Sequence, residues 1–168
     1  LKFLESSAGD HAVAGGVDAV SGEWRYVGDS STVTLRFGAD DQRARLPGPR
    51  TEAQLKTDPR GTSTPNDYAN SRTGQIGLLG EQRIGELTLA ADIAQRRKSS
   101  RYFFDFGFGF SSRQDTDVTV TSVSPRLHWN TTLAGMANRL TAGVDWSEWS
   151  YGNDTLSGFG NRDESGRQ

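Results

Sequence analysis

The feature that most constrains this chain is a long-range alternation of apolar and polar side chains. Val33, Leu35 and Phe37, for example, alternate with polar or small residues. A period of two places successive side chains on opposite faces of a β-strand, and a helical period does not fit these stretches. Six such runs occur, at 17–27, 33–40, 71–83, 87–94, 117–130 and 140–147. The sequence therefore predicts an all-β chain, an antiparallel up-and-down meander of about six long strands.

The connections between the runs alternate in length. Turn-forming residues at 28–31, 84–85 and 134–138 separate the first, third and fifth runs from their successors. Long loops are expected at about 46–70 and 98–116, and a polar loop or tail at 155–168. Short turns at one end and long loops at the other are typical of a transmembrane β-barrel. We therefore interpret 17–154 as a barrel segment, preceded by an irregular lead-in at 1–16.

Composition narrows the class of protein. The mean hydropathy is −0.64, and no window approaches the ~20 continuous apolar residues of a transmembrane helix. In a barrel only alternate residues face lipid, so a polar average is compatible with the membrane. A net charge of −2 argues against nucleic-acid binding. Without cysteine, the chain has neither a disulfide framework nor a thiolate metal site.

Two details of the runs make further predictions. The fifth run changes parity near Pro125, where we expect a bulge or kink. Aromatic residues gather toward the strand ends, which indicates either the interfacial girdles of a barrel or only the β preference of aromatics. These residues are Trp24, Tyr26, Trp129, Trp146, Trp149 and Tyr151.

Both expected loops have internal order. Thr51 and Gln54 have the spacing of a capping box, which predicts a short helix over 51–56. The second loop alternates aromatic residues and glycine over 102–110. Three interpretations stay open for that segment: an exposed recognition surface, a strand extending above the membrane, or an aggregation-prone zipper.

Several short motifs, in this order, resemble the TonB-dependent outer-membrane receptors over about 17–154. In the first loop they are Arg45-Leu46-Pro47-Gly48-Pro49, Thr51-Glu52-Ala53-Gln54-Leu55, Asp58-Pro59-Arg60 and Asn66-Asp67-Tyr68. In later strands they are Ser124-Pro125-Arg126-Leu127 with Trp129, Asn138-Arg139-Leu140 and Gly143-Val144-Asp145.

The resemblance implies a barrel of about 22 strands around an N-terminal plug, in the bacterial outer membrane, importing a scarce ligand with energy delivered through TonB. Six strands without a recognisable plug or TonB box would then be an internal part of such a receptor. An iron-siderophore complex or haem is the ligand expected by family analogy, and no cofactor is expected. Outer-membrane lipid and lipopolysaccharide are the other expected partners.

For the ligand site, loop aromatics are expected to stack on a planar or apolar ligand while arginines meet its negative groups. The candidates are Tyr68, Tyr102, Phe104, Phe106, Phe108, Phe110, Arg50, Arg97 and Arg101. The basic run 96–98 with Arg101 fits either a lipopolysaccharide phosphate site or simply solvated bases.

No catalytic motif is present, so we expect no enzyme activity. His11 and His128 have no second ligand at metal spacing, and Asp40 with Asp41 lacks the pattern of a calcium loop. Three alternatives remain. They are a soluble β-sandwich that binds a glycan or other ligand, a non-TonB outer-membrane barrel, and an enzyme on a β scaffold with convergent carboxylates.

Overall fold

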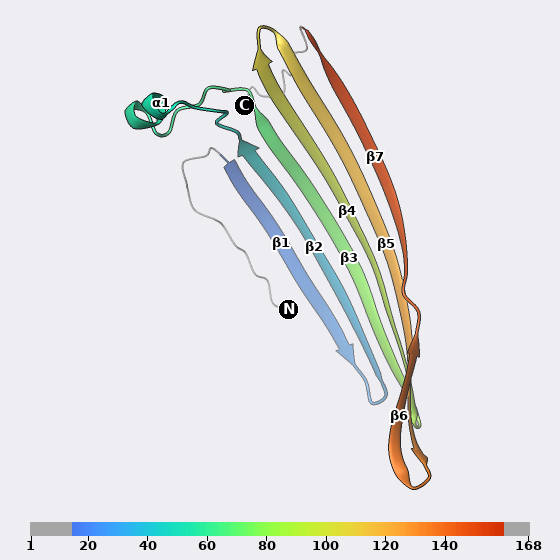
Figure 1. Ribbon diagram of the computed structural model, residues 1–168. Coiled ribbons are helices and arrows are strands. Elements are labelled where there is room, and N and C mark those ends of the chain that lie inside the picture. Colours follow the sequence, from blue (N-terminus) through green and yellow to red (C-terminus); the bar gives the residue numbers. More distant parts are fainter. Residues whose placement is uncertain (1–14, 160–168) are drawn as a thin grey trace.

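A computed structural model describes residues 15–159, which form one antiparallel sheet and one short helix (Figure 1). Five strands follow one another in the sheet in chain order, and β6 and β7 both pair with β5. The all-β meander predicted from the alternation is confirmed. The elements are β1 (Gly15–Val27), β2 (Ser31–Arg45), α1 (Glu52–Thr57), β3 (Tyr68–Ile84), β4 (Leu87–Gly107), β5 (Phe110–Leu133), β6 (Met136–Gly143) and β7 (Trp146–Phe159).

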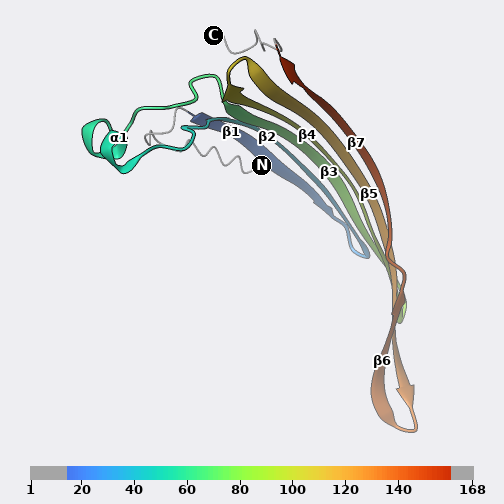
Figure 2. The same ribbon diagram turned by 45° about the horizontal axis from the view of Figure 1, so that its top comes forward.

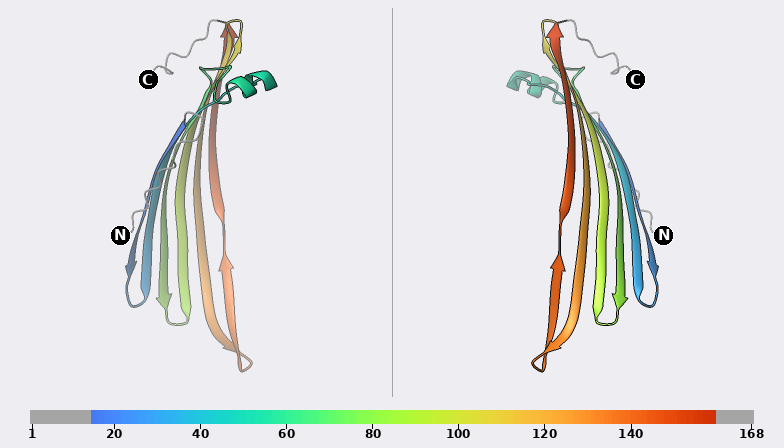
Figure 3. Two further views of the ribbon diagram at one scale, coloured as in Figure 1. Left: turned by 90° about the vertical axis from the view of Figure 1, so that its left-hand side faces the viewer. Right: turned by 90° about the vertical axis from the view of Figure 1, so that its right-hand side faces the viewer.

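Tight turns join the strands at one end of the sheet, at 28–30, 85–86 and 134–135. The loop of residues 46–67, which carries α1, lies at the opposite end (Figure 3). The second expected loop, 98–116, was wrong: β4 continues to Gly107 and β5 begins at Phe110. A strand extension, one of the three interpretations of the aromatic segment, is what forms.

The ends of the chain also differ in part from expectation. Residues 155–159 belong to β7 instead of a polar tail, and β1 already begins at Gly15. The remainder of the expected lead-in and tail, 1–14 and 160–168, lies outside the described residues.

The sixth expected strand is split into β6 and β7, and Pro125 on β5 accounts for the split. Both strands continue one register against β5, with Arg126 opposite Gly143 and Val123 opposite Trp146. Between them the Val144 amide donates to the Pro125 carbonyl over 3.2 Å. Proline has no N–H with which to complete that pair. The Arg126 guanidinium instead donates to the Val144 carbonyl over 2.8 Å.

We expected a bulge or kink near Pro125, but the β4–β5 pairing has no bulge at this position. Ala91 lies opposite Pro125 without a register shift, and the irregularity in this pairing lies between Asp105 and Gly107. Val118 and Val120 do face the other way from Leu127. β5 keeps one register with β4 past Pro125, so Val118 and Val120 stay on the opposite face from Leu127.

The sheet has two chemically different faces. One row of directly opposed residues crosses the sheet from β1 through β2, β3, β4 and β5 to β7. Every residue in this row is apolar: Trp24, Leu35, Leu78, Ile93, Val123 and Trp146. We call the face that carries this row the apolar face, and the other the polar face. Four of the six side chains in the row are exposed, among them Leu78 at 44% and Trp146 at 50%. A β-sandwich would bury this parity, and in residues 15–159 no second layer covers it.

The apolar character of that face is confined to the half of the sheet near the tight turns. On β4, Leu87, Leu89 and Ile93 share the face, but Arg97 and Arg101 follow farther along. On β5 the apolar stretch runs from Val123 to Leu133, about 33 Å at ~3.3 Å per residue. A tilt of about 45° reduces this to about 23 Å, close to the ~25 Å apolar band of membrane barrels.

The sheet is also curved and not flat, as Figure 2 shows. Curvature of this kind is what lets neighbouring strands close into a barrel. Trp24, Trp129 and Trp146 lie on the apolar face, as a girdle requires, but Trp149 and Tyr151 lie on the polar face. Among the described residues, no helix has the length and apolar character needed to cross a membrane.

Candidate functional site

The predicted aromatic candidates collect on the polar face at the end of the sheet remote from the tight turns. Tyr102, Phe104 and Phe106 share one parity of β4, and Phe110 continues the same face on β5. The rings form a chain, with centroids 6.4 Å apart for Phe104 and Phe106 and 5.9 Å for Phe106 and Phe110. Phe159 of β7 extends it, 5.3 Å from Phe110. Sequence reasoning missed Phe159 because that segment was interpreted as a polar tail.

Phe108 lies at the tip of the β4–β5 hairpin. Its φ of 53° is in the left-handed region, between Gly107 at 82° and Gly109 at 81°. The flanking glycines adopt this conformation without penalty, whereas phenylalanine does so at a cost. Its side chain is fully exposed, so this ring does not join the aromatic chain.

A cleft of about 680 Å³ lies between the 46–67 loop and the β4–β5 hairpin, and we call it the hairpin cleft. From the loop it is lined by Leu46, Gly48, Pro49, Ser63, Thr64, Pro65 and Asp67, and from the hairpin by Phe104, Asp105, Phe106 and Gly107. Of the predicted aromatic candidates, Phe104 and Phe106 line this cleft, and the loop contributes Pro49 and Pro65.

Hydrogen bonds fold the loop back on itself and tie it to β4. The Ser63 hydroxyl donates to the Pro49 carbonyl over 2.8 Å, and the Thr64 hydroxyl to the Leu46 carbonyl over 3.1 Å. Asp67 is buried, and its Oδ1 accepts the Asp105 amide over 2.7 Å. This contact fixes the loop against the hairpin, so the cleft has two anchored walls.

Arg50, predicted to meet a ligand, instead stabilises the loop helix. Thr51 and Gln54 form the predicted capping box at the start of α1, with bonds of 2.9 and 3.3 Å. The Arg50 guanidinium donates to the carbonyl oxygens of Gln54 and Asp58 at the other end. Only 9% of its side chain is exposed. Cations beside the last carbonyls of a helix satisfy groups that the helix cannot.

The other predicted charged and phenolic candidates lie on the opposite side of the sheet from the aromatic chain. Tyr68 is buried and stacks on Phe103, with centroids 5.8 Å apart. Arg97 pairs with Asp117 at 3.7 Å, and Arg101 with Asp115 at 2.6 Å. The sequence predicted one mixed site of rings and arginines, and the structure separates the two groups by the thickness of the sheet.

These arginines belong to a charged band on the apolar-face parity, beyond the apolar stretch. We define the band as Asp41, Arg43, Arg72, Arg97, Arg101, Asp115 and Asp117. Asp41 receives hydrogen bonds from Arg43 and from Arg72, the latter over 3.0 Å. The basic run splits, because Arg96 and Lys98 have the opposite parity.

The band shifts the pKa of two carboxyl groups. Partial burial raises the pKa of Asp115, but hydrogen bonds from Arg101 and Arg113 outweigh it, so the pKa lies below its ordinary value of 3.8. For Asp41 the hydrogen bond from Arg43 is the largest cause, and its pKa is likewise lowered. Hydrogen bonds donated to the ionised form account for both directions.

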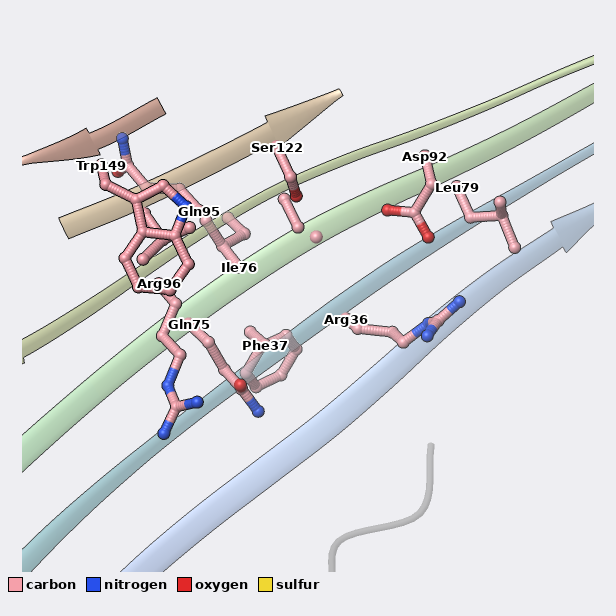
Figure 4. A pocket seen from close by; sticks show the side chains of 13 residues that line it. Arg36, Phe37, Gln75, Ile76, Leu79, Asp92, Gln95, Arg96, Ser122 and Trp149 are labelled. Carbon is pink, nitrogen blue, oxygen red and sulfur yellow. The ribbon is translucent and has the colours of Figure 1, made fainter. Parts of the chain in front are cut away.

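A further pocket of about 430 Å³ lies among polar-face residues nearer the middle of the sheet (Figure 4). Its polar lining includes Arg36, Gln75, Asp92, Arg96 and Ser122, with Trp149. Sequence reasoning did not single out this pocket, although residues of the polar parity on five strands, β2, β3, β4, β5 and β7, line it. The described residues contain no group of three or more potential metal ligands. His128 interacts with the Thr141 hydroxyl at 3.0 Å, and His11 lies outside the described residues.

No protein-family model matches the sequence, and no curated protein matches it with significant similarity. Among solved structures, the chain is similar to the ferric citrate transporter FecA in its unliganded form, with a TM-score of 0.75 and 14% identity. The similarity covers 89% of this chain and 23% of the transporter chain, so this chain spans about a quarter of that protein's length. At this identity the likeness establishes the fold, an antiparallel meander like that of a barrel protein.

Proposed function

We propose that this chain forms part of the wall and the outward-facing loops of an outer-membrane receptor that imports a scarce small ligand with energy from TonB. The proposal is supported mainly by the exposed side chains on the apolar face, in the half of the sheet near the tight turns. The fold of this sheet resembles part of a transporter. Contact with lipid would remove these apolar side chains from water, whereas a single sheet in water would leave them exposed.

In the proposed receptor, the two faces and the loop end of the sheet have different surroundings. The apolar face contacts lipid, and the polar face, with Arg36, Asp92 and Arg96, lines the interior. The hairpin cleft lies at the end away from the tight turns, which in such barrels is the outer side. An iron chelate is the ligand class suggested by the transporter FecA, and TonB and a plug would act through other parts of the receptor.

The charged band supports a contact with lipopolysaccharide. It lies on the lipid-facing parity but beyond the apolar stretch, at the level of the outer head groups. Arg72 and Arg97 expose more than 70% of their side chains, and arginine binds phosphate bidentately. The aspartates of the band offset much of the positive charge of its arginines. We therefore propose a contact between single arginines and single phosphate groups, and not a broad cationic surface.

Uptake in cells tests the proposed function. Bacteria that express the complete protein are supplied with iron-55 as ferric citrate or as a ferric hydroxamate chelate, in strains with and without functional TonB. We expect accumulation from at least one chelate that requires both the protein and TonB. Accumulation that is the same without TonB would contradict the proposal and indicate a passive barrel.

A further inference from the structure

We propose that the hairpin cleft binds aromatic ligands or ligand groups that are neutral or positively charged, and discriminates against negatively charged ones. Its role in import rests on the proposed function above. The binding preference itself follows from the side chains that line the cleft.

The apolar part of the lining is aromatic on one wall and proline-rich on the other. Phe104 and Phe106 come from β4, and Pro49 and Pro65 from the loop. Phe106 exposes 62% of its surface while in contact with its ring neighbours. Such a slot matches a planar ring, since aromatic pairs prefer offset or tilted contacts at 4.5–7 Å between centroids.

The charged part of the lining is acidic. Asp67 and Asp105 are the ionisable side chains among the described residues that line the cleft, and no arginine, lysine or histidine of the described chain joins them. Asp105 Oδ1 accepts the Gly107 amide over 2.9 Å, which directs this carboxylate toward the hairpin. An anionic ligand would meet negative charge there without a compensating cation, and such juxtapositions are a means of rejecting wrong partners.

The arginines that the sequence assigned to an anion are committed elsewhere. Arg50 is bound to the carbonyls at the end of α1, and Arg101 is paired with Asp115 on the other side of the sheet. Neither lines the cleft. A carboxylate-rich chelate such as ferric citrate would therefore be disfavoured in this cleft.

Three naphthalenes that differ in charge provide the test: 1-naphthalenemethylamine, 1-naphthalenemethanol and 1-naphthoate. Binding to the purified complete protein is measured by saturation-transfer difference NMR at neutral pH. We expect the amine and the alcohol to bind at least about tenfold more tightly than the carboxylate, a difference of ~1.4 kcal/mol. Equal or tighter binding of naphthoate to the wild-type protein would overturn the proposal.

Variants assign the binding to the cleft. Phe106→Ser should weaken amine and alcohol binding about tenfold, and Pro65→Lys should improve naphthoate relative to the amine. Tyr151→Ser is the matched control, because Tyr151 is an exposed aromatic of the polar face outside the cleft. An equal loss in the Tyr151 and Phe106 variants would overturn the assignment. These measurements need no transport, so a failure of TonB-dependent uptake is distinguished from a failure of charge selection.

Discussion

At the scale of single residues, the hairpin tip holds an unusual conformation. Phe108 adopts a left-handed φ, with its ring in solvent. We predict that Phe108→Gly leaves the hairpin intact and raises the free energy of unfolding by up to about 1 kcal/mol, since glycine accepts this φ without the Cβ clash. Denaturant unfolding of the complete protein measures the change. A loss of stability would show that the exposed ring makes a stabilising contact.

The ion pairs of Asp115 make the stability of the fold depend on pH. Its pKa is lowered in the folded protein, so its ion pairs with Arg101 and Arg113 stabilise the fold above pH ~4 and lose that effect as pH falls through the lowered value. Asp115→Asn should therefore lower the melting temperature at pH 7, and the variant should converge with the wild type as the pH falls below the lowered pKa of Asp115. A difference that persists unchanged at low pH would rule out this electrostatic cause.

The candidate site was predictable in its rings and not in its charges. Alternating aromatics over 102–110 identified one wall of the hairpin cleft directly from the sequence. Arg97 and Arg101 have odd numbers and Phe104 and Phe106 even ones, so on a single strand they point to opposite faces. The sequence analysis interpreted this segment as a loop, in which alternation does not determine the direction of side chains. Arg50 could not be placed, because its partners are carbonyls at the end of a helix it precedes.

At the scale of elements, Pro125 and Arg126 together determine where the sixth strand is interrupted. Arg126→Met should destabilise the junction of β6 and β7 by roughly 1 kcal/mol, since the Val144 carbonyl loses its donor. In a Pro125→Ala background, a backbone N–H is restored and the same substitution should cost less. Hydrogen exchange of the amides at 143–147 measures both effects. Equal costs in the two backgrounds would contradict the compensation.

The loop element depends on Arg50 for its local stability. Arg50→Met removes the donor to the last carbonyls of α1 while retaining most of the side-chain volume. We predict faster proteolysis within 50–61, with binding of the three naphthalenes changed less than twofold. A larger loss of anionic than of cationic probe binding would instead return Arg50 to the ligand site.

The strands were predictable because period-two alternation fixes both the element and its faces. What the sequence did not reveal was the β-pairing beyond the apolar stretch, where polar residues such as Ser99 and Thr116 lie on paired strands without an apolar face. The sequence identified Pro125 as a disruptive residue, but the interruption lies in the neighbouring chain segment between β6 and β7. The sequence did not show that the missing N–H of Pro125 would face this neighbour.

At the scale of the whole molecule, the chain alone leaves a large apolar area uncovered. Leu89, Ile93 and Trp146 are among many exposed apolar side chains on one face. We predict that the isolated 168-residue chain associates in detergent-free buffer, as unpaired strand edges and exposed apolar patches favour. Analytical ultracentrifugation checks this, and a monodisperse monomer with a cooperative thermal transition would contradict it.

We propose that one face of this sheet contacts lipid near the tight turns and leaves the lipid farther along. Because the chain has no cysteine, single cysteines at 88–101 of β4 in the complete protein, reconstituted in bilayers, can carry nitroxide labels. Accessibility to oxygen and to a water-soluble nickel chelate is then measured by electron paramagnetic resonance. We predict oxygen-accessible labels at Leu89, Ala91 and Ile93, alternating with less accessible ones, and nickel-accessible labels at Arg97 and Arg101. Uniform protection of Leu89, Ala91 and Ile93 from both reagents would place the apolar face inside a protein core and contradict the account.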